Sequence, residues 1–378
     1  KNINKYKSEN INPAKTPDTV FEMYSVPIYE TGHPEYLRGS QIASNKAVVE
    51  KNDILVCKIN PRINRVWIVS DESDNLNIAS SEWIVVRNNE YNPEFLAWYF
   101  RTPRFQKLMT SEVTGIGGSL TRAQPKSVAE YPVPVLDRNT QNEIVARLNK
   151  CKIIIDSKEQ ELEQLDTLVK SRFVEMFGDI ITGKYNYKIR KLGDVAFIGS
   201  SHRVFTTEFV ESGIPFYRGT EIGELANGIE PSEPYYISEE HYNKLTKDNT
   251  KPRIGDLLMP SICNKGQIWM VDTDRPFYYK DGRVLCISPN RDIFNSKYLE
   301  YFMRIKTLVE YPKLGSGSTF AEFKIFLLKD MDVLVPPRNV QNQFADFVAS
   351  VDKSKSKIQK SLEETQLLFD SLMQKYFG

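Results

Sequence analysis

The chain has 378 residues, of which 40% are hydrophobic, and its formal net charge is +1 at pH 7. This length and apolar content allow two cores of ordinary size. The near-zero charge excludes a globally basic nucleic-acid binder, so such a ligand would be held by local patches. No apolar run approaches the ~18 residues of a membrane span, and the polar start is not a signal peptide, so we expect a cytoplasmic protein.

One long stretch occurs twice in the sequence at a constant spacing. Its two copies open with Arg-Asn-x-Gln-Asn at residues 138–142 and 338–342, and they close with Phe-Gly at residues 177–178 and 377–378. A repeat of this length outranks any single motif as a guide to the fold. The chain is therefore expected to consist of two similar halves.

Both copies have the apolar spacing of a coiled coil. Apolar residues recur at alternating steps of four and three over residues 144–176 and 344–376, with Lys158 and Lys355 inside the two seams. The first copy begins with Thr140-x-x-Glu143, the spacing of a capping box, and the closing glycines can end each helix. Because neither helix can bury its seam alone, we expect the two to pair as an antiparallel coiled coil.

The segments before the two helices also resemble each other. Residues 53–57 and 66–69 read as two strands joined by a polar connector, and residues 256–259 and 268–271 repeat this pattern. Aromatic helices are expected at residues 94–101 and 297–304, and residues 216–222 resemble residues 36–42.

The repeat predicts an α+β protein with an internal pseudo-two-fold repeat. Two similar mixed α/β domains, residues 1–139 and 180–338, alternate with helical spacers at residues 140–179 and 339–378. Residues 1–30 are expected either to be truncated or to fold differently from the second domain, because the first domain has no counterpart of Lys191–Val195.

The first connector is rich in side chains that recognise DNA. In extended geometry several of its polar groups share one face, and Arg and Asn match the edges of guanine and adenine. The candidates are Lys58, Asn60, Arg62, Asn64 and Arg65. The alternative is an ordinary solvated hairpin. When the connector is considered alone, this alternative is favoured, because charged turns are common.

A glycine-rich loop at residues 114–124 can bring backbone amides close to phosphates. It is neither G-x-G-x-x-G nor a P-loop, so it is a weak signal for a nucleotide cofactor. This loop contributes the candidates Ser119, Thr121, Arg122 and Gln124. The second half contributes His202, Arg203, Tyr217, Arg218, Ser261, Asn264, Lys265, Gln267, Ser318 and Thr319.

No catalytic motif is visible. An adenine methyltransferase needs an Asn/Asp-Pro-Pro-aromatic motif, but here each Asn-Pro is followed by Ala14, Arg62 or Glu94. The four cysteines form no C-x-x-C pair and the three histidines are scattered, so neither a disulfide framework nor a zinc site is indicated. Without a nucleophile–base set, the sequence predicts a binding protein rather than an enzyme.

The ordered set of motifs resembles the specificity subunit of a type I restriction-modification enzyme. The resemblance rests on the Arg-Asn-x-Gln-Asn and Phe-Gly motifs, the glycine loops and Lys191–Val195, and it covers essentially the whole chain. It implies two target-recognition domains that each read one half of a split, asymmetric double-stranded DNA target. With the repeat included, DNA contact becomes the favoured role for the connectors and glycine loops.

The same resemblance implies partners in a host-defence complex. Two modification subunits are expected on the helices and domain flanks, where they bring S-adenosylmethionine and adenine methylation. Restriction subunits are expected to bring ATP, Mg and cleavage, whereas this chain is expected to hold no cofactor. Two alternatives remain at this point: a coiled-coil scaffold with protein-binding heads, which suits the near-neutral charge, and an enzyme that binds a cofactor in the glycine loop.

Overall fold

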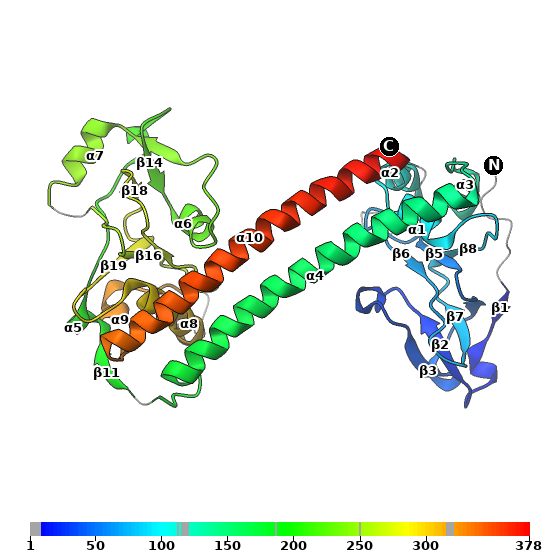
Figure 1. The fold of residues 1–378 in the computed structure, drawn as a ribbon, viewed down its shortest axis with the longest axis horizontal. Coiled ribbons are helices and arrows are strands. Elements are labelled where there is room, and N and C mark those ends of the chain that lie inside the picture. The colour runs from blue at the N-terminus through cyan, green and yellow to red at the C-terminus, as the bar shows by residue number, and fades with distance from the viewer. Residues whose placement is uncertain (1–8, 112, 115–120, 186, 249–250, 315–320) are drawn as a thin grey trace. The chain divides into compact units, whose positions relative to one another are not determined.

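Two units make up the structure, a computed structural model that describes residues 9–111, 113–114, 121–185, 187–248, 251–314 and 321–378. Unit 1 consists of residues 1–160 and 359–378, and unit 2 of residues 161–358. Each unit contains a mixed α/β domain and one half of each long helix, α4 (Arg138–Phe177) and α10 (Arg338–Phe377) (Figure 1). In the described part of the chain, no helix combines the length and apolar character needed to cross a membrane.

Unit 1 is built on a five-stranded sheet and a three-stranded sheet. Its elements before α4 are β1 (Asn10–Ile11), β2 (Val20–Tyr24), β3 (Glu35–Arg38), β4 (Lys46–Val48), β5 (Ile54–Cys57), β6 (Val66–Ile68), β7 (Leu76–Ala79), β8 (Trp83–Val86), α1 (Pro93–Phe100), α2 (Pro103–Ser111), β9 (Val113–Thr114), β10 (Arg122–Ala123) and α3 (Pro125–Glu130). The strand orders are β1-β4-β7-β2-β3 and β6-β5-β8, and β9 pairs with β10.

Unit 2 has two four-stranded sheets. Its elements between the long helices are β11 (Lys188–Lys191), α5 (Leu192–Val195), β12 (Ala196–Gly199), β13 (Phe209–Val210), β14 (Ile214–Tyr217), α6 (Gly219–Leu225), β15 (Tyr235–Ile237), α7 (Glu239–Leu245), β16 (Leu257–Pro260), β17 (Trp269–Met270), β18 (Tyr278–Tyr279), β19 (Val284–Pro289), α8 (Ser296–Glu310), α9 (Ile325–Lys329) and β20 (Asp332–Val335). The strand orders are β13-β15-β14-β18 and β12-β19-β16-β17, and β11 pairs with β20.

A strand buried on both faces organises each domain. Along β5, Ile54 and Val56 belong to a hydrophobic cluster shared with α1 and the start of α4, whereas Leu55 and Cys57 belong to a second cluster. The strand β16 divides its side chains between two clusters in the same way. Side chains alternate across a strand, so one continuous apolar run supplies two cores.

The glutamine of the repeated Arg-Asn-x-Gln-Asn motif has a structural role. Gln141 and Gln341 are buried, and the Oε1 of each accepts the backbone N–H of an asparagine, Asn92 at 2.8 Å and Asn295 at 2.9 Å. These asparagines are the N-caps of α1 and α8. The motif therefore fastens the aromatic helix of each unit to the long helix that begins there.

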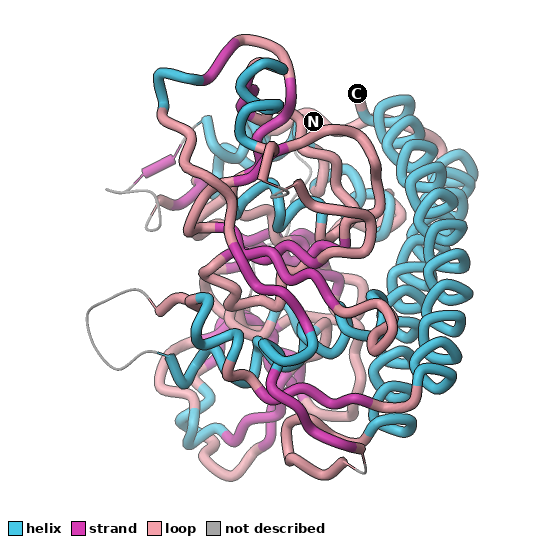
Figure 2. Tube along the Cα trace, turned by 90° about the vertical axis from the view of Figure 1, so that its left-hand side faces the viewer, coloured by secondary structure: helices cyan, strands magenta, loops and turns pink. Residues whose placement is uncertain are grey.

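The helices α4 and α10 run antiparallel, as the sequence predicts. In each unit a half of α4 lies beside a half of α10 (Figure 2). The residue numbers of the hydrogen-bonded side chains rise along α4 while they fall along α10. The polar pairs are Arg147–Tyr376 and Lys158–Ser361 in unit 1 and Lys355–Asp166 in unit 2. Both seam lysines thus have a polar partner.

The heptad seam of α4 ends earlier than its spacing predicts. The spacing places Arg172 and Met176 on the seam, but Phe173 and Phe177 are the buried residues. Both phenylalanines pack against Tyr298 of α8, with ring centroids 6.2 and 4.7 Å apart. The last part of α4 faces a domain as well as a helix, so its apolar residues recur every four positions.

The two ends of α4 differ in how well the sequence predicts them. The N-terminus is capped by Asp137 rather than by Thr140, because the Thr140 N–H donates to Asp137 Oδ1 at 3.0 Å. At the C-terminus, Gly178 has the expected left-handed conformation, with φ 89°. A Cβ atom at this position would lie 2.2 Å from the carbonyl oxygen of Lys184, so only glycine fits.

Strand pairing corrects the alignment of the two halves. The similarity of residues 36–42 to residues 216–222 equates β3 with β14. However, β14 pairs antiparallel with β15 and parallel with β18, just as β2 pairs antiparallel with β3 and parallel with β7. The strand β14 is therefore the counterpart of β2, and Tyr217 is the counterpart of the buried Tyr24.

Candidate nucleic-acid interface

The connector of unit 1, residues 58–65, turns instead of extending. Asn60 has a φ of 46°, and the Ile63 N–H donates to the Asn60 carbonyl oxygen at 2.9 Å. The expected single polar face is therefore wrong, because a turn directs successive side chains differently. The Asn60 N–H donates to the Thr121 carbonyl oxygen at 2.8 Å, which brings the connector beside the end of the glycine-rich loop.

Some candidates in this region are already bonded within the protein. Asn64 Nδ2 donates to the Phe100 carbonyl oxygen at 3.0 Å, and the Arg122 guanidinium donates twice to the Glu82 carboxylate at 3.1 Å. Arg62 is exposed. The half-buried candidates are Lys58, Asn60, Arg65, Thr121 and Gln124. Among the candidates of unit 1 that the structure describes, Arg62 is therefore the one most open to a ligand.

The connector of unit 2 forms a second ordered turn. The Lys265 N–H donates to Gln267 Oε1 at 3.0 Å, and Gly266 between them has a φ of 66°. A Cβ atom at Gly266 would lie 2.8 Å from the carbonyl oxygen of Arg304, so the turn packs closely on α8. Asn264 and Lys265 are exposed at its tip.

This turn lines a cleft of about 450 Å³ together with α6 and Arg304. Arg304 Nη2 donates to the carbonyl oxygens of Ala226 and Ile268 at 2.8 and 2.9 Å and thereby ties the end of α6 to the turn. The contributions of α6 and Arg304 to this cleft are not among the residues predicted from the sequence. No local pattern could have identified them, because the lining segments are far apart in the chain.

Two of the predicted site residues cannot contact DNA directly where the structure places them. Tyr217 and Ser261 are only 8% and 1% exposed. Tyr217 packs on Phe277 with ring centroids 5.3 Å apart, and burial raises its pKa. The Ser261 N–H and carbonyl oxygen bond the backbones of Arg283 and Phe323. Both residues are corrected to core positions.

Three further candidates are paired with carboxylates. The pairs are Arg218–Glu221 at 3.1 Å, His202–Asp248 at 2.6 Å and Arg203–Asp281 at 3.3 Å. Burial alone would raise the pKa of Glu221, but hydrogen bonds from Arg218 and from backbone amides outweigh it and hold this pKa below its ordinary value. A DNA phosphate would have to compete with these carboxylates. Ser119, Ser318 and Thr319 lie outside the described residues.

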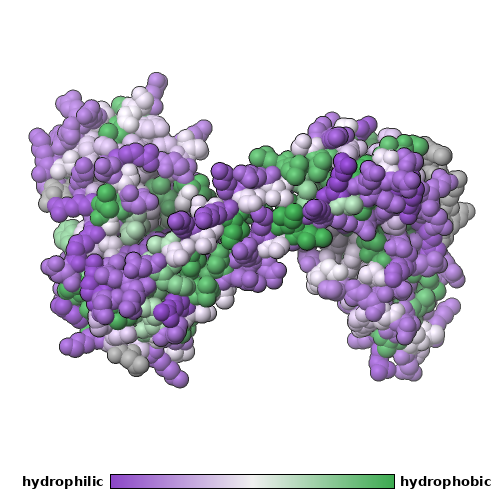
Figure 3. Space-filling model, in the orientation of Figure 1, coloured by the Kyte–Doolittle hydropathy of each residue, from purple (hydrophilic) through white to green (hydrophobic). Residues whose placement is uncertain are grey.

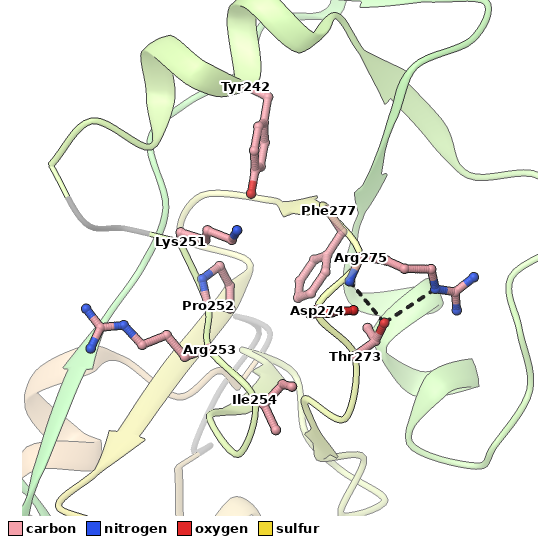
Figure 4. Close-up of a pocket in the computed structure, with 9 residues that line it drawn as sticks. All are labelled: Tyr242, Lys251, Pro252, Arg253, Ile254, Thr273, Asp274, Arg275 and Phe277. Carbon is pink, nitrogen blue, oxygen red and sulfur yellow. Dashed lines mark hydrogen bonds between the residues drawn. The ribbon is translucent and has the colours of Figure 1, made fainter.

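A separate hollow of about 200 Å³ in unit 2 contains none of the predicted site residues. Tyr242 of α7 points its hydroxyl toward the hollow, and Lys251 and Phe277 lie below it (Figure 4). That hydroxyl is buried and has no hydrogen-bond partner among the described residues, and burial raises its pKa. Within the described part of the chain, no cluster of three His, Cys, Asp or Glu residues could hold a metal ion.

Comparison with solved structures decides the fold. A chain from a structure described as showing complex assembly and conformational transition of the type I R-M system matches with a TM-score of 0.58 and 20% identity, over 98% of this chain and 95% of that one. The type I restriction-modification system S subunit from M. genitalium matches with a TM-score of 0.56 and 14% identity, over 99% and 97%. The chain has the fold of a type I S subunit.

A third similar structure is the HsdS subunit from Thermoanaerobacter tengcongensis, with a TM-score of 0.42 and 18% identity over 99% of this chain and 94% of that one. No protein-family model matches the sequence. The S-subunit fold agrees with the order of elements along the chain, in which two α/β domains alternate with two long helices. Each domain lies in a unit that also contains one half of each helix.

Proposed function

We propose that this chain is the DNA-specificity subunit of a type I restriction-modification system. Each α/β domain reads one half of a bipartite double-stranded DNA target, and the chain itself catalyses nothing. The observation that carries the proposal is the S-subunit fold over the whole chain, at 98% coverage and a TM-score of 0.58.

The two connectors support a target with different halves. They occupy equivalent places between β5 and β6 and between β16 and β17, but they present different side chains. Arg62 is the open side chain of the first connector, whereas Asn264, Lys265 and Gln267 belong to the second. Because side-chain donors and acceptors select base edges, unlike connectors favour unlike half-sites.

The surface of the long helices supports a partner role. Apolar side chains lie exposed along them amid a mostly hydrophilic surface (Figure 3). In unit 1, Ile153 is 68% exposed, Leu367 71% and Leu368 53%. We assign these outer faces to two modification subunits, which bring S-adenosylmethionine, with restriction subunits bringing ATP and Mg. The complex acts in the cytoplasm, where it methylates or restricts DNA.

Fluorescence anisotropy with random duplex DNA tests the proposal. If the chain neutralises about six phosphates, its affinity should fall by about a thousandfold between 50 and 200 mM salt. A scaffold with protein-binding heads, which the net charge of +1 suits, would show no DNA binding at either salt concentration.

A second test addresses catalysis. The purified chain should transfer no methyl group from labelled S-adenosylmethionine to DNA until modification subunits are added. Methyl transfer by the chain alone would contradict the non-catalytic role. Methylation mapping in the host would then give the target, and a palindromic target would contradict the proposed asymmetry.

A further inference from the structure

The side chain of Gln267 has a defined orientation in the unit 2 cleft. A backbone N–H can only donate, so the Lys265 N–H at 3.0 Å identifies the facing atom of the Gln267 amide as its oxygen. The amide nitrogen then carries two N–H donors on the other side, and it bonds no described residue. Gln267 and the exposed Lys265 therefore offer the cleft hydrogen-bond donors.

The α6 side of the same cleft offers acceptors. Asn227 Nδ2 donates to the Gly223 carbonyl oxygen at 2.7 Å, which leaves the Asn227 Oδ1 to accept a hydrogen bond. Glu224 lies about one helical turn before Asn227 and contributes a half-buried carboxylate to the cleft. Arg304 also lines the cleft, but its Nη2 is engaged by Glu300 and two carbonyl oxygens, and its Nε is buried without a hydrogen-bond partner among the described residues, so neither atom is open to a base.

The division of donors and acceptors matches one kind of base pair. In the major groove guanine presents two acceptors, N7 and O6, and cytosine presents a donor, N4–H₂. Adenine presents one acceptor and one donor, so a glutamine reads it only with both ends of its amide. The Gln267 oxygen faces the Lys265 N–H, and the Lys265 ammonium can only donate, so these two side chains match the two acceptors of guanine better than the acceptor and donor of adenine.

We infer that the unit 2 cleft reads a G·C base pair. Gln267 and Lys265 donate to guanine, while the Glu224 carboxylate accepts from cytosine. The inference rests on the proposed function and adds the base pair and the residues that select it. Gln267 is thereby a specificity-determining residue, and Lys265 both contacts the base and fixes the orientation of Gln267.

The test is selection of bound sequences from a randomised duplex library with the full chain and its Gln267→Glu variant. Glutamate keeps an acceptor for the Lys265 N–H but replaces the two donors with an oxygen, which can accept from cytosine N4. The wild type should enrich a guanine at one position of one half-site. The variant should lose the preference for guanine there by at least about tenfold and leave the other half-site unchanged.

Controls separate the possible outcomes. Gln343→Glu makes the same charge change at an exposed position of α10 and should select the wild-type sequence. If Gln267→Glu does not fold, Glu224→Gln serves instead and should relax the choice of base pair at the same position. An unchanged guanine in either folded cleft variant overturns the inference but leaves the proposed function standing. Failure of the wild type to enrich any sequence overturns the proposed function itself.

Discussion

Replacement of Gln341 by leucine should destabilise unit 2 strongly. Gln341 is fully buried, and its side chain makes three hydrogen bonds to backbone groups. It accepts from the Asn295 N–H at 2.9 Å, and it donates to the carbonyl oxygens of Ile293 and Pro336 at 2.9 and 2.8 Å. Leucine is similar in size but leaves all three groups without this partner.

The size of the effect follows from the number of groups left unpaired. A buried polar group without a partner costs ~1–3 kcal/mol, and a carbonyl oxygen can partly relax toward another donor. We therefore expect Gln341→Leu to lower the free energy of unfolding by ~3–5 kcal/mol. Gln141→Leu should cost less, ~2–3 kcal/mol, because among the described residues the Gln141 side chain bonds two groups, the Asn92 N–H and the Leu136 carbonyl oxygen.

Urea unfolding measures both losses. Trp67, Trp83 and Trp98 lie in unit 1 and Trp269 lies in unit 2, so fluorescence reports mainly on unit 1, while circular dichroism reports on both units. Gln343→Leu is the matched control, because Gln343 is exposed on the same turn of α10 and should change the stability by less than ~0.5 kcal/mol. A Gln341→Leu variant as stable as this control would refute the reasoning.

Three further predictions concern unit 2. Glu221→Gln should lower the free energy of unfolding at pH 7. Because the pKa of Glu221 is held below its ordinary value of 4.5, the loss should shrink as the pH falls below about 4.5, and an equal loss at pH 7 and pH 3.5 would contradict the ion pair. Burial raises the pKa of Cys263 to about 11 and that of Cys286 to about 12. Neither thiol should therefore react with a disulfide reagent at pH 8 until urea unfolds the chain. Rapid labelling of the native protein would contradict this burial. Tyr242→Phe removes a buried hydroxyl that has no hydrogen-bond partner among the described residues. In thermal unfolding this variant should be as stable as the wild type or more stable by ~1 kcal/mol. A clear loss of stability would show that the hydroxyl has a hydrogen-bond partner.

Elements with a periodic apolar pattern could be predicted from the sequence alone. The two helices, 40 residues each, begin and end within two residues of the predicted limits, and the strands β5 and β6 lie where apolar runs predict them. These elements are predictable because spacing along the chain decides which side chains share a face. The antiparallel pairing also follows, since each seam needs an apolar partner.

Only the tertiary structure decided which similar-looking segments are equivalent and which polar residues are open. Residues 36–42 resemble residues 216–222, but hydrogen bonding between strands, which local sequence does not encode, equates β14 with β2. Tyr217 and Ser261 have the chemistry of DNA contacts, but packing of distant strands buries them. Similarly, the cleft exists because Arg304 of α8 joins the end of α6 to the turn after β16, and such long-range contacts depend on the whole fold.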